Sequence, residues 1–137
     1  MTSESAKDVV RDFIEVMNGH DLDHLPDVLA DDFSLPVGGG RVDRNGLRAV
    51  LTYYFAAFPD LHYEVKDLIA EGDAAVVRVM MTGTHSGAEY GGQAATGNAF
   101  AVWETDWFRV IDDRIASYEI LWDELGFRRQ LGLPLDA

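Results

Sequence analysis

The sequence contains no cysteine, which excludes disulfide bridges, thiolate nucleophiles and cysteine-ligated zinc. Basic residues are scarce: the chain has 11 Lys and Arg residues and 24 Asp and Glu residues. Its net charge is therefore −13. Such a balance repels phosphate backbones and anionic lipid surfaces, so we expect neither nucleic acid nor a membrane as a partner. Solubility is the simpler explanation of the acidic excess, and a cationic substrate is the sharper one.

Long apolar runs are also missing, and none approaches the roughly 20 residues that a membrane span requires. Residues 1–8 lack the basic and then apolar pattern of a secretion signal, so we expect a soluble, cytoplasmic protein. A chain of 137 residues with 47% apolar residues is sufficient for one full core. We therefore expect residues 1–137 to form a single domain.

The order of the periodic segments predicts an α+β fold, with helices first and antiparallel strands after them. Helices are expected at residues 3–18, capped by Ser3 or Ser5, and at 22–29, 44–57 and 123–130. A short edge strand is expected at 33–37, before a glycine loop at 38–40. Two hairpins are expected at 61–84 and 100–123, with turns at Gly72-Asp73 and Asp112-Asp113 and a loop at 83–97 between them.

The last hairpin carries the main chemical anomaly. Its period of two places Glu104 and Asp106 on the same face as Val102, Phe108 and Val110. If that face is the core face, Asp106 is a buried or cavity-lining acid, which costs several kcal/mol unless it is hydrogen-bonded or protonated. An acid at this position is therefore a candidate catalytic group.

Tyr118 and His85 are the candidate partners of this acid. Tyr118 can stand beside Asp106 across the two strands and bind either the acid or a ligand, although a self-satisfied Asp-Tyr pair is the structural alternative. His85 shares a face with Val79 and Met81, and either a structural hydrogen bond or a role in orienting the substrate fits it. No third ligand accompanies His20 and His24, so we expect no metal site.

Six short segments resemble the SnoaL-like polyketide cyclase family, within the group that shares the fold of nuclear transport factor 2 and ketosteroid isomerase. They are Phe58-Pro-Asp-Leu, Glu71-Gly-Asp, Gly83-Thr-His-Ser-Gly, Asp106-Trp-Phe-Arg-Val, Arg114-Ile and Arg128-Arg-Gln-Leu-Gly. The resemblance implies a cone-shaped, curved antiparallel sheet that wraps, with three N-terminal helices, around an apolar pocket (NTF2-like, cystatin-like α+β). It also implies a homodimer.

The catalytic sets of well-known members of this group are mostly absent. SnoaL-type cyclases use an aspartate at the position of Ile120 and a histidine at that of Asp106. Ketosteroid isomerases place their base near Leu35, a tyrosine at Phe13 and a protonated aspartic acid at Asp106, and only the last is kept here. Limonene-epoxide hydrolases need an arginine and two aspartates at the positions of Val79, Met81 and Ile120.

The resulting hypothesis is a small enzyme that acts on an apolar, carbonyl-bearing or polycyclic molecule by acid/base chemistry, in cyclisation, isomerisation or a related proton transfer. Asp106 is either the base or a protonated hydrogen-bond donor, with Tyr118 and His85 orienting the substrate oxygen. No metal or organic cofactor is expected. The alternative is a non-catalytic binding or interaction protein. The pocket is expected to consist of Phe13, Met17, Leu35, Tyr54, Phe58, Val79, Met81, Glu104, Phe108, Ile120 and Trp122.

The opposite face of the same hairpin predicts self-association. It carries Trp103, Trp107 and Leu121, and a two-fold interface would cover these residues. The alternative is a monomer in which Arg78 and Arg109 lie over the indole rings.

Overall fold

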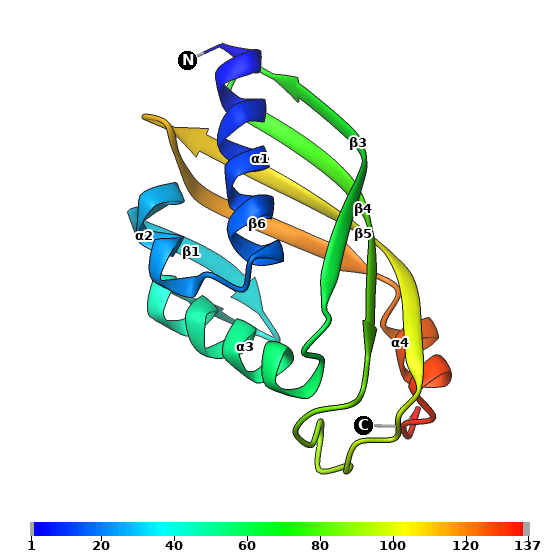
Figure 1. Cartoon of the computed structure of the whole chain (residues 1–137). Helices are drawn as coiled ribbons and strands as arrows, with labels where there is room; N and C mark the ends of the chain where they lie inside the picture. Colours follow the sequence, from blue (N-terminus) through cyan, green and yellow to red (C-terminus); the bar gives the residue numbers. More distant parts are fainter. Residues whose placement is uncertain (1, 136–137) are drawn as a thin grey trace.

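A curved six-stranded sheet is the scaffold of the protein, and helices cover its concave face (Figure 1). The computed structural model describes residues 2–135. The strands are β1 (Leu29–Val37), β2 (Gly40–Val42), β3 (His62–Glu71), β4 (Ala74–Thr84), β5 (Ala99–Ile111) and β6 (Arg114–Trp122). The helices are α1 (Ser3–Asn18), the 3₁₀ turn η1 (Leu22–His24), α2 (Leu25–Val28), α3 (Arg44–Ala57) and α4 (Glu124–Leu131). The predicted α+β class is confirmed.

The sheet order is β2-β1-β6-β5-β4-β3, so the first strands of the chain lie beside the last one. All neighbours are antiparallel except β1 and β6, which run parallel, with Leu29 opposite Ile115 and Ser34 opposite Ser117. The expectation of a purely antiparallel sheet needs this correction. Within residues 2–135, no helix has the length and apolar character needed to cross a bilayer.

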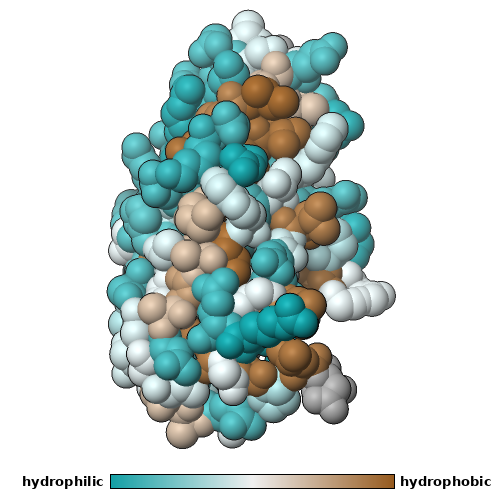
Figure 2. Space-filling model, turned by 90° about the vertical axis from the view of Figure 1, so that its right-hand side faces the viewer, coloured by the Kyte–Doolittle hydropathy of each residue, from teal (hydrophilic) through white to brown (hydrophobic). Residues whose placement is uncertain are grey.

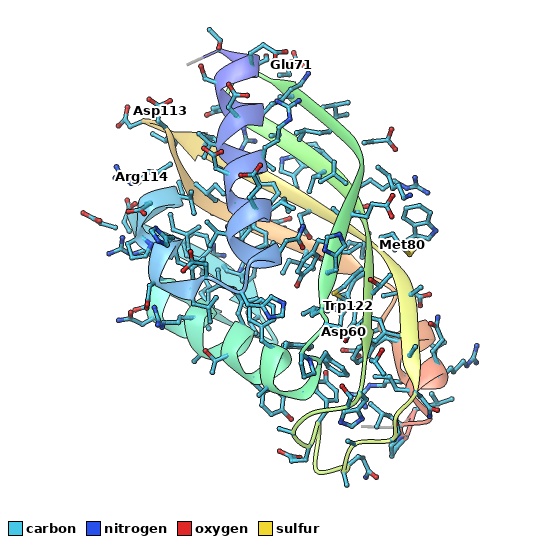
Figure 3. All side chains as sticks on the ribbon, in the orientation of Figure 1. Asp60, Glu71, Met80, Asp113, Arg114 and Trp122 are labelled. Atoms are coloured by element: carbon cyan, nitrogen blue, oxygen red, sulfur yellow. The ribbon has the colours of Figure 1, made fainter. Side chains whose placement is uncertain are left out.

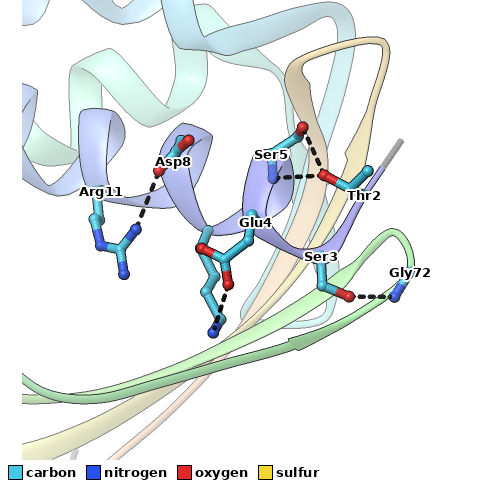
Figure 4. A network of polar contacts seen from close by, with 8 residues as sticks. Thr2, Ser3, Glu4, Ser5, Asp8, Arg11 and Gly72 are labelled. Atoms are coloured by element: carbon cyan, nitrogen blue, oxygen red, sulfur yellow. Dashed lines mark hydrogen bonds and ion pairs between the residues drawn. The ribbon is translucent and has the colours of Figure 1, made fainter.

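The start of α1 is held by hydroxyl groups (Figure 4). Thr2, and neither Ser3 nor Ser5, is the N-cap, because its hydroxyl accepts the Ser5 backbone N–H at 3.1 Å. Ser3 Oγ instead accepts the N–H of Gly72 at 3.2 Å, which ties the helix to the turn of the β3–β4 hairpin. The position of α1 over the sheet is therefore fixed at this end by a side-chain contact as well as by its apolar face.

The segment after α1 differs from expectation in three ways. The second helix is split into η1 and α2 and ends at Val28, because Leu29 is fully buried as the first residue of β1. The strand is therefore longer than the predicted 33–37, and it is not at the edge. The edge is formed by β2, which returns antiparallel after Gly38 and Gly39, whose φ angles of 56° and 94° suit only glycine without strain.

Both long hairpins form as predicted, and their turns require left-handed residues. Asp112 and Asp113 have φ angles of 52° and 61°, and Gly72 has 60°. Burial alternates strictly along β5, where Phe100, Val102, Glu104, Asp106, Phe108 and Val110 are buried. The inner face of the sheet is thus the face that carries both acids.

The C-terminal helix closes one end of the molecule. Asp123 caps α4 by accepting the N–H of Gly126 at 2.8 Å, and Gly132 ends it in the left-handed conformation. Phe127 packs edge-on against Phe100 at 4.8 Å and Trp122 at 5.0 Å between ring centroids. The end of β6 is therefore covered by aromatic packing.

Candidate functional site

A cavity of about 340 Å³ lies between the concave face of the sheet and the helices α1 and α3. Eight helices and strands contribute to its wall, and Trp122, labelled in Figure 3, lies at the end of β6, next to α4. This volume falls at the small end of the range for small-molecule sites. The lining residues are Met17, Leu35, Pro36, Val37, Gly38, Leu47, Val50, Leu51, Tyr54, Tyr63, Met81, Glu104, Asp106, Tyr118, Ile120, Trp122 and Glu124.

Two carboxyl groups of β5 point into this cavity. Glu104 and Asp106 are two residues apart on the inner face, and their exposed fractions are 7% and 1%. The residues opposite Asp106 on the neighbouring strands are Val77 and Ile120, which offer no polar group. Neither carboxyl oxygen of Asp106 has a hydrogen-bond partner among residues 2–135. An acid in this state is costly to the fold, and it is therefore a candidate functional group.

Burial separates the proton affinities of the two acids. Loss of hydration raises the pKa of Asp106 well above its ordinary value, and the negative charge of Glu104 raises it further. Burial also raises the pKa of Glu104, but the neighbouring Asp106 side chain opposes that change. These directions favour the proton on Asp106, the more deeply buried of the two, and the two acids titrate as an interacting pair.

Two tyrosines, Tyr63 and Tyr118, line the cavity beside the acid pair. The ring of Tyr118 is fixed by stacking on Phe108 at 4.8 Å and by an edge contact with Phe13 at 5.5 Å. Burial and the nearby acids raise the pKa of Tyr118 and that of Tyr63 well above the ordinary tyrosine value. Both phenols therefore stay protonated and are available as hydrogen-bond donors.

Tyr63 was missed by sequence reasoning, although a signal for it existed. The alternation of β3 places it on the inner face, and it pairs with Met81, which was predicted to line the pocket. Asn18 holds this position through two hydrogen bonds to the backbone of Tyr63, at 2.8 and 2.9 Å. The Asn18 side chain thus replaces the missing neighbour of β3, which is an edge strand.

The expected pocket residues divide into two groups. Met17, Leu35, Tyr54, Met81, Glu104, Ile120 and Trp122 line the cavity, together with Asp106 and Tyr118. Contrary to expectation, the wall does not include Phe13, Phe58, Val79 and Phe108, which are completely buried in the surrounding core. These residues support the wall, since Phe13 and Phe108 both contact the ring of Tyr118.

His85 lies away from the cavity and makes structural hydrogen bonds. It is fully buried where β4 has ended, and its Nε2 donates to the carbonyl oxygen of Ala88 at 3.1 Å. Its Nδ1 accepts the N–H of Thr96 at 3.4 Å, so both ring nitrogens are used by the loop between β4 and β5. The expectation that His85 orients a substrate therefore has no geometric support.

The chemistry of the lining is that of an acid/base site without cations. The cavity wall contains no Lys, Arg or His side chain. No cluster of three His, Asp or Glu side chains suited to a metal ion occurs between residues 2 and 135. The wall offers the Asp106 carboxyl group, whose pKa is raised by burial, a second carboxyl group at Glu104, and phenol donors, all surrounded by apolar side chains. Such a set can donate hydrogen bonds to a substrate oxygen and accept a proton from carbon.

Comparison with known proteins agrees with this architecture. IdmH of Streptomyces antibioticus, provisionally described as a polyketide cyclase, is 29% identical and superimposes with a TM-score of 0.83 over 93% of this chain and 99% of its own. TsrD of Streptomyces laurentii is 28% identical, with a TM-score of 0.87 over 98% of this chain and 99% of its own. AclR of Streptomyces galilaeus, provisionally described as a hydroxylase, shares the fold at 23% identity, with a TM-score of 0.86 over 97% and 100% of the two chains.

No curated protein matches the chain in sequence. The profile of the SnoaL-like polyketide cyclase family matches residues 7–131, which include every residue of the cavity wall. The chain therefore belongs to the SnoaL-like polyketide cyclase family.

Proposed function

We propose that this protein is an enzyme that transfers a proton on an apolar, carbonyl-bearing small molecule, as in a cyclisation or an isomerisation. The observation that carries the proposal is the state of Asp106, a buried acid without a partner beside a second acid in an apolar cavity. Packing alone gives no reason for this arrangement, because an apolar residue would be more stable there.

The two acids have different roles in the proposed reaction. Asp106 keeps its proton and donates a hydrogen bond to the substrate carbonyl oxygen, with Tyr118 as a second donor. Glu104 ionises first and is the base that removes a proton from the carbon next to the carbonyl group. Negative charge then develops on the oxygen that the two donors contact, and each such donor contributes about 10²- to 10³-fold to the rate.

The comparisons support cyclisation within this class, since IdmH is described as a polyketide cyclase at 29% identity. The histidine and aspartate that the resemblance assigns to SnoaL-type cyclases are replaced here by Asp106 and Ile120. The proposed base is therefore Glu104, which lies two residues before Asp106 on the inner face of β5. No metal or organic cofactor takes part in the proposed reaction.

The test is turnover of polycyclic ketones and enones by the wild-type protein and by Asp106→Asn and Glu104→Gln. Each variant should lose about 10²- to 10⁴-fold in kcat, the contribution of a positioned general acid or base. Glu119→Gln is the matched control, because Glu119 is an exposed acid of β6. If the Asp106 and Glu104 variants stay within about tenfold of wild type, the proposed roles are wrong. Ligand binding without any turnover would instead favour a binding protein.

We also propose a homodimer formed through the outer face of the sheet. Trp107 and Leu121 are 52% and 77% exposed there, and Figure 2 shows apolar patches between polar groups on the side of the molecule that carries β3 to β5. Arg78 lies 3.5 Å from the ring centre of Trp103, so one indole is already covered within the monomer. Trp107 and Leu121 are the side chains that a second copy would bury.

A further inference from the structure

The charge inventory around the acid pair limits what this cavity can bind. The ionisable groups that face Glu104 and Asp106 are Tyr63 from β3, Tyr118 from β6, Tyr54 from α3 and Glu124 from α4. None of them can carry a positive charge. At the edge of the cavity Arg128 approaches Glu124 only to 3.9 Å, and Arg128 is not part of the wall. Within residues 2–135, the buried pair therefore has no counter-ion in the cavity wall.

The other notable content of the wall is aromatic. Tyr54, Tyr63, Tyr118 and Trp122 line the same cavity as the two acids. Aromatic rings together with carboxylates are the groups that proteins use to bind organic ammonium ions, since ring faces attract cations and carboxylates neutralise them. The net charge of −13 also raises the local concentration of cations around the protein.

We infer that this cavity binds apolar amines as ammonium ions, with the nitrogen placed against Asp106 and Glu104. The ammonium ion donates its N–H groups to both carboxyl groups. Glu104 is the carboxylate of the proposed reaction, and Asp106 releases its proton to solvent, so that one proton leaves for each ammonium ion that binds. Both oxygens of Asp106 are free to accept the N–H donors. Removing the proton from Asp106 costs free energy when the pKa of Asp106 lies above the working pH. This cost weakens amine binding tenfold for each pH unit of that difference, and the ion pair that forms offsets the loss.

An anion meets the opposite situation in the same place. A carboxylate or phosphate group would lie beside buried acids with no cation to neutralise it, and it would lose its hydration as well. The cavity should therefore rank ligands of equal shape as amine, then alcohol, then carboxylate. This ranking concerns the charge of the ligand and not the reaction, so it goes beyond the proposed function.

The test uses three ligands on one bicyclic scaffold: naphthalen-2-ylmethanamine, naphthalen-2-ylmethanol and 2-naphthoate. Isothermal titration at pH 6.5, in two buffers of different ionisation enthalpy, gives both the affinity and the number of protons released. The amine should bind at least about tenfold more tightly than the alcohol, as expected for hydrogen bonds to a charged group. Amine binding should release about one proton, alcohol binding should release none, and the carboxylate should bind most weakly.

The double variant Asp106→Asn, Glu104→Gln assigns the preference to the acid pair. It should lose the preference for the amine over the alcohol, and cooperative thermal unfolding shows that its fold is intact. Equal affinity of wild type for amine and alcohol would overturn the inference. So would a preference that survives in the double variant, or one that releases no proton. Turnover of ketones does not enter this test, so its outcome is independent of the proposed reaction.

Discussion

Asp106→Asn is expected to change how the stability of the protein depends on pH. The ordinary pKa of an aspartate is about 3.9, and burial holds the pKa of Asp106 well above that value in the folded state. A raised carboxyl pKa stabilises the fold fully below pH 3.9, and this contribution is lost as the pH rises to the folded-state pKa. Within that window the wild-type protein loses about 1.4 kcal/mol of stability per pH unit through Asp106.

Asparagine removes this loss because it does not ionise. Its amide remains buried without a partner, which costs about 1–3 kcal/mol, but that cost does not depend on pH. Glu104 ionises in both proteins, and the part of its titration that depends on the Asp106 side chain also contributes to the difference between them. The stability of the variant relative to wild type should therefore rise by about 1.4 kcal/mol per pH unit above pH 4, and become constant above the folded-state pKa.

Urea denaturation at pH 5, 6, 7 and 8, at fixed protein concentration, measures this difference. Glu15→Gln is the control and should show no such trend, because this acid of α1 is exposed and belongs neither to the cavity wall nor to the outer face of the sheet. A difference between Asp106→Asn and wild type that stays constant from pH 5 to 8 would refute the reasoning. A variant that loses relative stability as the pH rises would show that Asp106 is ionised and stabilised in the folded protein.

Three further predictions concern other parts of the molecule. Tyr118→Phe keeps the ring contacts and removes one hydrogen-bond donor, the hydroxyl group. The kcat should therefore fall about 10²-fold with little change in thermal unfolding. A kcat within a few-fold of wild type would show that Tyr118 is not a catalytic residue. Sedimentation of the wild-type protein at micromolar concentration should show a dimer. The double variant Trp103→Glu, Trp107→Glu should be a monomer. If the double variant is still a dimer, the interface lies elsewhere. Gly87→Ala should lower Tm by several degrees, because a Cβ there would lie 2.0 Å from the carbonyl oxygen of Ala56, and equal Tm values for Gly87→Ala and Ser86→Ala would contradict this.

The sequence predicted the inner face of the sheet well because strand alternation is a local property. The period of two along β5 identified the face that carries Asp106, and all its members are buried in the structure. Alternation does not say how far along a face a cavity extends. Phe108 shares the face of Asp106 but is packed between Phe13 and Tyr118, so it supports the wall instead of forming it.

Two further differences have equally physical reasons. The parallel pairing of β1 with β6 joins segments that are remote in sequence, and neither segment carries a local signal for its partner. His85 does follow the inner-face alternation of β4, and it is buried, but the strand ends at Thr84 and the chain turns away from the cavity there. Counting by twos therefore predicted its burial but not its surroundings.

The parallel pairing also determines when the cavity can come into existence during synthesis. The wall formed by β1 carries Leu35, and its only neighbours in the sheet are the short β2 and the last strand, β6. A nascent chain that has left the ribosome up to the end of β4 already contains α1, β1 and α3, yet β1 has no long partner to join. Contacts between such distant segments form late and slowly. The edge of β1 that pairs with β6 therefore remains open to water until β6 has been synthesised.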